Sequence, residues 1–178
     1  MNDIQLISRA ACFAADRHRN LVRKGEKGTP YINHLAEVAE LVAIATQGQD
    51  AALVAAAWLH DTIEDTATTH EEIVLHFGED VGALVMEATD DKSLPKQERK
   101  RLQEVNAPHK SARAKILKTA DKLSNVRELA SDPPDDWDGA RRRAYVDWAA
   151  RVVAGLRGGA PDLEAEFDAV VREALSRL

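Results

Sequence analysis

The residues best suited to chemistry lie in the segment 59–66, which reads Leu-His-Asp-Thr-Ile-Glu-Asp-Thr and follows an apolar run of helix formers. If that helix continues, His60 and Glu64 share a face, because side chains four positions apart lie on the same side of a helix. The same spacing relates Asp61 to Asp65. Crowded carboxylates repel one another unless a proton or a cation lies among them. The segment therefore indicates a site for a metal ion.

Two other positions add candidate metal ligands. His34 lies in the first turn of another expected helix, and Asp121 lies on the apolar face of a third. A carboxylate among apolar residues is unfavourable unless it is paired or bound to a cation, and a salt bridge from Asp121 to Lys118 or Lys122 is an equal alternative. Together with the His-Asp pair, these residues suit Mn²⁺, Fe²⁺ or Zn²⁺. An octahedral ion would keep positions open for water or substrate.

The composition predicts an all-α protein. The chain has 178 residues, enough for one domain with a full core, and it is rich in Ala and Leu with few aromatic residues. One cysteine, Cys12, cannot form an internal disulfide, which fits a reducing, cytoplasmic setting. The N-terminus has no signal-peptide pattern, and no apolar run is long enough to span a bilayer. We expect neither a membrane partner nor a targeting segment.

The spacing of apolar residues predicts roughly eight to ten helices in a single domain over residues 1–178. Asp50 is an expected helix cap, Thr68 or Thr69 is another, with Thr69 and Glu72 at the spacing of a capping box, and Gly78 is an expected stop. Loops are marked by Gly, Pro or Asp clusters, and no internal repeat or linker interrupts the chain. The longest expected helices cover about residues 4–20, 32–45, 111–130 and 137–156.

The charge is unevenly distributed. The chain carries a net charge of −6, which argues against binding to a nucleic-acid backbone. Residues 92–122 nevertheless contain ten Lys or Arg against three Asp or Glu. A solvated helical face is the ordinary explanation of such a stretch. The alternative is a basic rim that attracts a small polyanion, provided that it lies beside the metal site.

The order of these motifs resembles a known family. His34, His60-Asp61 and Asp121 match the metal-binding pattern of HD-domain phosphohydrolases, which are helical bundles. Over about residues 10–157 the chain is similar to the hydrolase domain of the RelA/SpoT enzymes, and in particular to the stand-alone small alarmone hydrolases, including the metazoan SpoT homologues. The segments that carry this resemblance are 23–25, 29–34, 59–66, 89–96, 98–101 and 120–125.

The resemblance implies a manganese-dependent pyrophosphohydrolase. Its substrate would be the small molecule guanosine 3′,5′-bis(diphosphate), ppGpp, or pppGpp, and its products GDP or GTP and pyrophosphate. The metal would lower the pKa of a bound water, and Glu64 and Asp65 would position that water and handle its proton. The implied ligands of Mn²⁺ are His34, His60, Asp61 and Asp121.

The substrate contacts that we expect are mostly cations, because the substrate carries phosphates at both ends of its ribose. Each has a plainer explanation as a solvated surface charge, or as core packing for Tyr145. The remaining histidines, His18, His70, His76 and His109, are expected at the surface. The expected substrate contacts are Arg23, Lys24, Lys92, Lys96, Arg101, Asn125, Arg141 and Tyr145.

Two rival functions stay open at this point. One is an HD-domain phosphohydrolase acting on another nucleotide, such as a deoxynucleotide, a cyclic nucleotide or NADPH. Cyclic-nucleotide enzymes tend to carry extra histidines where this chain has Glu64 and Asp65. The other is a non-catalytic nucleotide sensor, which would be expected to lose a ligand or the acidic pair. Ser124 is smaller than the aromatic residue or His that many relatives have at this position, which leaves the nucleotide preference open. The oligomeric state is open as well.

Overall fold

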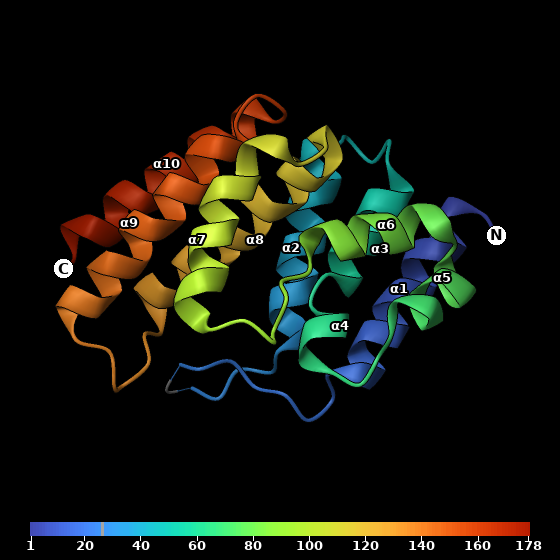
Figure 1. The fold of residues 1–178 in the computed structure, drawn as a ribbon, viewed down its shortest axis with the longest axis horizontal. Helices are drawn as coiled ribbons and strands as arrows, with labels where there is room; N and C mark the ends of the chain where they lie inside the picture. The colour runs from blue at the N-terminus through green and yellow to red at the C-terminus, as the bar shows by residue number, and fades with distance from the viewer. Residues whose placement is uncertain (26) are drawn as a thin grey trace. The chain divides into compact units, whose positions relative to one another are not determined.

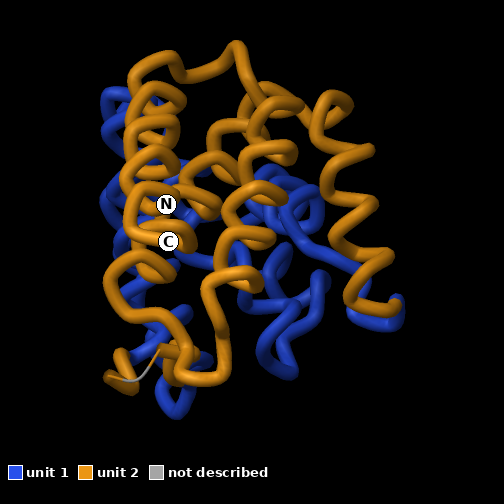
Figure 2. Tube along the Cα trace, turned by 90° about the vertical axis from the view of Figure 1, so that its left-hand side faces the viewer, with its two compact units in different colours: residues 1–21, 30–94 blue, residues 22–29, 95–178 orange. Residues whose placement is uncertain are grey.

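The computed structural model describes residues 1–25 and 27–178 (Figure 1). In that part of the chain the regular structure consists of ten α-helices and one short 3₁₀ helix, η1. This confirms the all-α fold predicted from the sequence. None of the described helices is both long and apolar enough to cross a membrane. The chain forms two compact units, unit 1 with residues 1–21 and 30–94 and unit 2 with residues 22–29 and 95–178 (Figure 2).

Unit 1 is built around helix α3, which packs against α1, α2 and α6, while α5 packs against α6. Leu53, Leu59 and the three alanines 55–57 of α3 are fully buried. A helix that is apolar on all sides must be enclosed, and alanine lets neighbouring helices approach closely. The helices of unit 1 are α1 (Asp3–Arg17), α2 (Ile32–Ala45), α3 (Ala51–Leu59), α4 (Thr62–Asp65), α5 (His70–Phe77) and α6 (Glu79–Ala88).

The predicted caps of unit 1 are confirmed. The Asp50 carboxylate accepts the Leu53 backbone N–H at 3.0 Å, and the Thr69 hydroxyl accepts that of Glu72 at 3.2 Å. Each satisfies an N–H group that has no partner within its own helix. Gly78 separates α5 from α6 with φ of +88°, a backbone conformation that glycine adopts without strain.

The helix that delivers His60 does not continue into the acidic segment, so the shared helical face considered for His60 and Glu64, and for Asp61 and Asp65, is not formed by one continuous helix. Helix α3 ends at Leu59 and α4 begins at Thr62. The Nδ1–H group of His60 donates to the carbonyl of Ala57 at 2.8 Å. Because that side-chain bond competes for a carbonyl that helix continuation would use, it favours a turn after Leu59.

Unit 2 consists of the long helix α8 packed against α9 and α10, with α7 and η1 packed against α9. Leu117, Leu123 and Val126 bury the apolar face of α8, and Asp121 is buried on the same helix. The observed bounds of α8 and α9 lie within two residues of those predicted. The helices of unit 2 are α7 (Lys96–Asn106), η1 (Ala107–His109), α8 (Ala112–Ser131), α9 (Gly139–Leu156) and α10 (Pro161–Ser176).

The cap of α3 gives a first prediction. Replacing Asp50 with Ala removes the acceptor for the Leu53 N–H group and should lower the free energy of unfolding by about 1 kcal/mol. Urea denaturation measures this as a lower midpoint at an unchanged slope. Asp50→Asn is the matched control, because asparagine caps a helix about as well as aspartate. An equal loss in both variants would contradict the assignment of Asp50 as a cap.

Candidate active site

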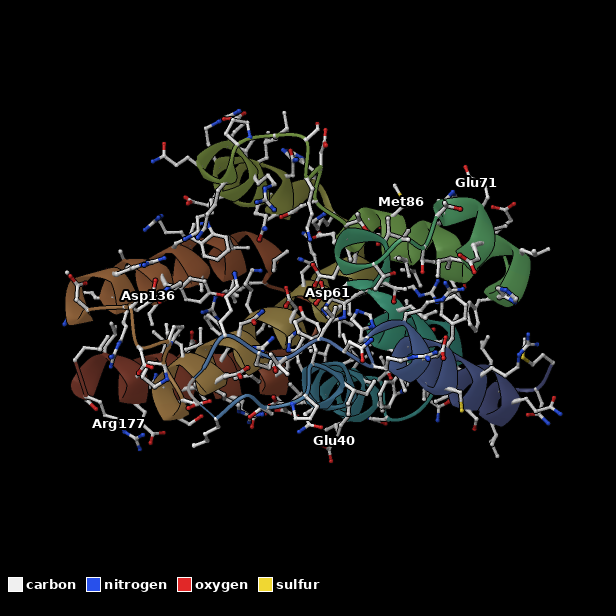
Figure 3. All side chains as sticks on the ribbon, turned by 90° about the horizontal axis from the view of Figure 1, so that it is seen from below. Glu40, Asp61, Glu71, Met86, Asp136 and Arg177 are labelled. Carbon is white, nitrogen blue, oxygen red and sulfur yellow. The ribbon has the colours of Figure 1, made fainter. Side chains whose placement is uncertain are left out.

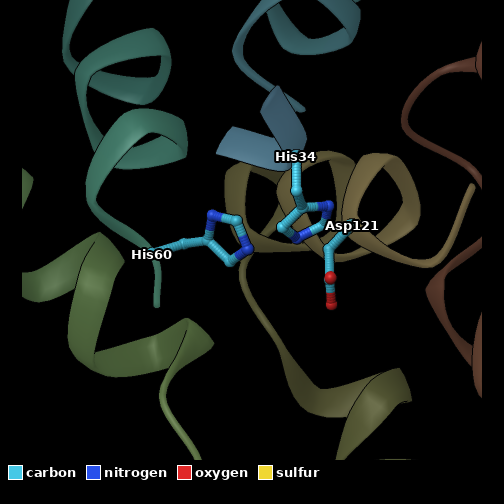
Figure 4. A group of neighbouring side chains, drawn as sticks. All are labelled: His34, His60 and Asp121. Carbon is cyan, nitrogen blue, oxygen red and sulfur yellow. The ribbon is translucent and has the colours of Figure 1, made fainter. Parts of the chain in front are cut away.

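In unit 1, three side chains meet at one oxygen of Asp61. Its Oδ2 atom lies 3.1 Å from Nε2 of His60 and 3.5 Å from Nε2 of His34. The Tyr31 hydroxyl donates to the same oxygen at 2.7 Å. Figure 4 shows the imidazoles of His34 and His60 turned toward each other, with ring centroids 5.2 Å apart. In Figure 3 Asp61 lies among crowded side chains, whereas Glu71 of the same unit lies at the surface.

The surroundings of Asp61 favour its ionised form. Burial raises the pKa of Asp61, but the charge of His60 and hydrogen bonds from His34 and His60 outweigh that effect and hold the pKa well below its usual range. Only 16% of the Asp61 side chain is exposed, and 1% of each imidazole. A carboxylate enclosed in this way is stable only with positive partners.

The donor atoms around Asp61 fit a divalent metal. Because Nδ1 of His60 donates its proton to the Ala57 carbonyl, Nε2 carries the lone pair in the neutral ring. That lone pair faces a carboxylate oxygen at 3.1 Å, which is repulsive unless a proton or a cation lies between them. Atoms bound about 2.2 Å from an octahedral ion lie about 3 Å from each other. Two imidazole nitrogens and a carboxylate oxygen therefore have both the chemistry and the spacing of a metal site.

Tyr31 is supported by a histidine from the end of α1. The rings of His18 and Tyr31 stack nearly parallel, with centroids 5.4 Å apart and planes 8° apart. His18 is 1% exposed, and its Nδ1–H group donates to the Ala14 carbonyl at 2.9 Å. The surface position expected for His18 was wrong, because its ring packs on an aromatic ring instead of facing water. His109 is exposed, as expected.

The two acids of α4 are bound to the loop that follows α6. Oε1 of Glu64 accepts the backbone N–H of Asp90, and Oδ1 of Asp65 accepts a hydrogen bond from Nζ of Lys92, each at 2.5 Å. Lys92, expected from the sequence to bind phosphate, is thus paired with Asp65. The loop thus holds both carboxylates in place. Glu64 and Asp65 lie in α4, which directly follows the turn that carries the candidate ligands His60 and Asp61.

In unit 2, Asp121 belongs to a hydrogen-bonded chain. Its Oδ2 atom accepts from Nζ of Lys118 at 3.1 Å and of Lys122 at 3.0 Å, so the salt bridges considered from the sequence are present. Its Oδ1 atom accepts from Asn125 at 2.6 Å, and Asn125 accepts in turn from Arg23 at 2.9 Å. Asp121 is buried and drawn on α8 in Figure 4. Its role as a metal ligand stays a prediction.

Three aromatic rings of unit 2 form a row. Trp137 and Tyr145 lie 5.6 Å apart, and Tyr145 and Trp148 lie 5.3 Å apart, between ring centroids. The Arg141 guanidinium lies 4.4 Å and Nζ of Lys96 lies 5.9 Å from the Trp137 centroid. Arg141 and Tyr145 therefore share a face of α9, as their spacing predicted. We call these three rings the aromatic row.

Three of the expected substrate cations influence one another. Burial lowers the pKa of Lys96, and the nearby charges of Lys24 and then Arg141 lower it further. Arg101 instead forms a two-pronged ion pair with Glu98 on its own helix, at 2.7 and 2.9 Å. The basic stretch thus contains both an exposed cation paired on its own helix, Arg101, and a cation close to others elsewhere in unit 2, Lys96.

Three residues near these groups were not predicted from the sequence: Tyr31, Trp148, and Lys100, whose Nζ lies 4.3 Å from the Trp148 ring centroid. Tyr31 lies within a segment that carries the family resemblance, but an aromatic residue next to a proline gave no sign of a bond to Asp61. The position of Lys100 could have been noticed from the sequence. It stands four positions after Lys96, an expected substrate contact, so the two side chains share a face of α7. Arg101, five positions after Lys96, turns away from that face.

A model of the HD domain matches residues 10–150 of the chain.

The chain belongs to the HD-domain family.

This HD-domain protein is similar over almost its whole length to proteins named guanosine-3′,5′-bis(diphosphate) 3′-pyrophosphohydrolase MESH1. It is 51% identical to that of Xenopus tropicalis over 167 residues, which cover 94% of this chain and 93% of the relative. It is 52% identical to that of Homo sapiens over 155 residues, 87% of each protein. The resemblance to stand-alone alarmone hydrolases is confirmed.

A solved structure shares the fold of this HD-domain protein. It is described as a metazoan ortholog of SpoT that hydrolyzes ppGpp. The two chains align with a TM-score of 0.90 and 44% identity, over 94% of each. The helical HD-domain architecture expected from the resemblance is therefore confirmed.

The bond from Tyr31 to Asp61 gives a second prediction. Tyr31→Phe keeps the stack on His18 but removes the hydroxyl that orients Oδ2. Asp61 is a predicted metal ligand, and losing a partner that orients such a ligand lowers metal affinity about 10- to 100-fold, so we expect weaker Mn²⁺ binding by the metal-free protein in titration calorimetry.

The control is Tyr145→Phe, which removes the same atom from the other tyrosine of the chain. Tyr145 lies in the aromatic row of unit 2, so this variant should bind Mn²⁺ like the wild type. Equal affinity of Tyr31→Phe and the wild type would show that the hydroxyl does not orient Asp61.

Proposed function

We propose that the chain hydrolyses guanosine 3′,5′-bis(diphosphate) or its pentaphosphate at the 3′-pyrophosphate, giving GDP or GTP and pyrophosphate. The observation that carries the proposal is the convergence of two imidazole nitrogens on Asp61. It occurs in a chain about half identical to relatives named for this activity. A non-catalytic sensor would not need acids beside these donors, and here Glu64 and Asp65 both follow them.

The proposed cofactor is Mn²⁺. A bound divalent cation supplies Lewis-acid chemistry, acidifying water and polarising phosphoryl oxygens. Nitrogen and oxygen donors without cysteine suit manganese. In this proposal both units together form one hydrolase domain, and the residues that hold the ion are His34, His60, Asp61 and Asp121.

Glu64 and Asp65 carry out the proton chemistry in this proposal. A carboxylate accepts the proton of the attacking water as the water oxygen forms a bond to the phosphorus next to the ribose 3′ oxygen. The bond from that phosphorus to the 3′ oxygen breaks, and the 3′ oxygen leaves with a proton. The backbone N–H of Asp90 and the ammonium of Lys92 fix the two carboxylates, which limits their rotation before the reaction.

Cations and polar groups of the two units bind the substrate in this proposal. The charges of Lys24, Lys96 and Arg141, close enough to repel one another, are matched by the phosphates of the ligand. We assign the enzyme to the cytoplasm, with a small nucleotide as its partner and with neither nucleic acid nor membrane. The proposed substrate contacts are Arg23, Lys24, Lys92, Lys96, Arg101, Asn125, Arg141 and Tyr145.

A substrate panel tests the proposed function directly. The purified protein, loaded with Mn²⁺, is incubated with ppGpp, pppGpp, NADPH and deoxynucleoside triphosphates, and the products are separated by ion-exchange chromatography. We expect pyrophosphate and GDP from ppGpp, and loss of the activity when a chelator removes the metal. Turnover of another nucleotide alone would identify a different HD-domain phosphohydrolase. Binding of ppGpp without any turnover would identify a sensor.

The acidic pair gives a third prediction. Glu64→Gln keeps an acceptor for the Asp90 N–H group but cannot take a proton, so turnover of ppGpp should fall at least about 100-fold. Metal content, measured by elemental analysis, should stay at the wild-type level. Glu71→Gln is the matched control, since Glu71 is an exposed glutamate of the same unit, and it should keep full activity.

His60→Ala separates metal binding from proton transfer. It removes one of the donors that face Asp61, so both metal content and turnover should be lost together. Loss of metal from Glu64→Gln would contradict the assignment of Glu64 as a base. Retention of full metal content by His60→Ala would contradict the assignment of His60 as a ligand.

A further inference from the structure

Lys100 occupies an unusual place in unit 2. Its side chain is half-buried, with Nζ 4.3 Å from the ring centroid of Trp148 and 5.1 Å from that of Tyr145. The indole N–H of Trp148 donates to the backbone carbonyl of Lys100 at 3.1 Å, which fixes the ring beside the stem of the lysine. Nζ of Lys122 lies 5.0 Å from the same indole. Two ammonium groups thus approach one ring.

The charges around Lys100 are mostly positive. Lys96 of α7, Lys122 of α8 and Arg151 of α9 all repel its ammonium, and Glu104 is the acid that attracts it. Glu104 is itself held by Arg151 at 2.9 and 3.2 Å. Burial first, and these cations next, lower the pKa of Lys100 to about 8. The faces of the aromatic rings compensate only part of this repulsion.

A cluster of cations beside aromatic rings is typical of a site that binds a phosphorylated ligand. We propose that Lys100 is a substrate-binding residue whose ammonium contacts a phosphate group, next to Lys96 on the same face of α7. The several positive charges of the cluster favour a ligand with several negative charges, such as a di- or polyphosphate. Its identity as ppGpp rests on the proposed function. An anion at this position relieves the repulsion that Lys96, Lys122 and Arg151 impose.

The site responds to pH in a defined direction. The protonated form of Lys100 binds a phosphate and the neutral form does not, so affinity falls as pH rises through about 8. Arginine stays charged over this range. The titratable and charged groups that face the ammonium are Lys96 and Glu104 of α7, Lys122 of α8, and Tyr145 and Arg151 of α9.

Titration calorimetry on the full chain tests the proposal. A chelator removes metal to prevent turnover, and ppGpp and inorganic pyrophosphate are each titrated into the protein at pH 7, 8 and 9.5. For the wild type we expect affinity to fall about tenfold from pH 7 to 9.5, because one charge-assisted contact is lost. Lys100→Gln should bind about tenfold more weakly at pH 7, with a smaller further fall. Lys100→Arg should keep its affinity up to pH 9.5.

Matched controls separate this contact from the general charge of unit 2. Arg143→Gln removes one exposed charge from α9 and should bind like the wild type. Thermal unfolding should be similar in all variants, because Trp148 is hydrogen-bonded to the backbone of residue 100 and not to its side chain. Lys100→Arg reports on the site even if the Gln variant unfolds.

Three outcomes would overturn the proposal: unchanged affinity in Lys100→Gln, the same pH dependence in Lys100→Arg and the wild type, or no binding of either ligand by the wild type. The Mn²⁺-loaded wild type is assayed for ppGpp turnover in parallel. Phosphate binding that depends on Lys100, without any turnover of ppGpp, would count against the proposed function and leave the binding site standing.

Discussion

The organisation of unit 1 depends on neutralising one mostly enclosed carboxylate. Tyr31, before α2, donates a hydrogen bond to Asp61, and nitrogens of His34, within α2, and His60, at the end of α3, face the same carboxylate, which requires a proton or a cation between them. An enclosed charge without such partners would be too unfavourable to keep. The need to satisfy it therefore fixes the rotation of α2, the end of α3 and the path of the chain before α2.

Unit 2, in contrast, brings several positively charged side chains close to one another. Several of its cations lie beside aromatic rings, and the charged neighbours that act on Lys100 are three cations and one acid. Lys96 and Arg141 lie over Trp137, while Lys100 and Lys122 lie over Trp148. The ring faces attract the cations that lie over them, and the buried ammonium of Lys122 is also paired with Asp121 at 3.0 Å.

Much of this architecture could be predicted from residue spacing. Apolar periodicity predicted the bounds of α2, α8 and α9, since each of these helices has a continuous buried stripe. Asp50 and Thr69 were recognised as caps because a short polar side chain before an apolar run has few other uses. The ordered histidines and aspartates indicated a metal, and those of unit 1 meet at Asp61.

What could not be predicted depends on contacts that periodicity does not encode. The turn after Leu59 follows from a bond between the His60 ring and the Ala57 carbonyl, and helix propensity contains no term for it. The burial of His18 depends on its stacking against the ring of Tyr31, a contact between residues that are separated along the sequence. Lys100 was overlooked because the sequence does not distinguish it from the adjacent cation Arg101. Their environments do: Lys100 lies beside an aromatic ring, and Arg101 is paired with Glu98.

The alanines of α3 have a consequence for how this enzyme can change over generations. Ala55, Ala56 and Ala57 are completely enclosed, and the last of them also accepts the bond from the His60 ring. A larger residue at any of these positions would push the neighbouring helices apart and tilt the imidazole with them. Sequence drift in this helix is therefore constrained by chemistry as much as by folding, even though the three methyl groups face only the protein interior.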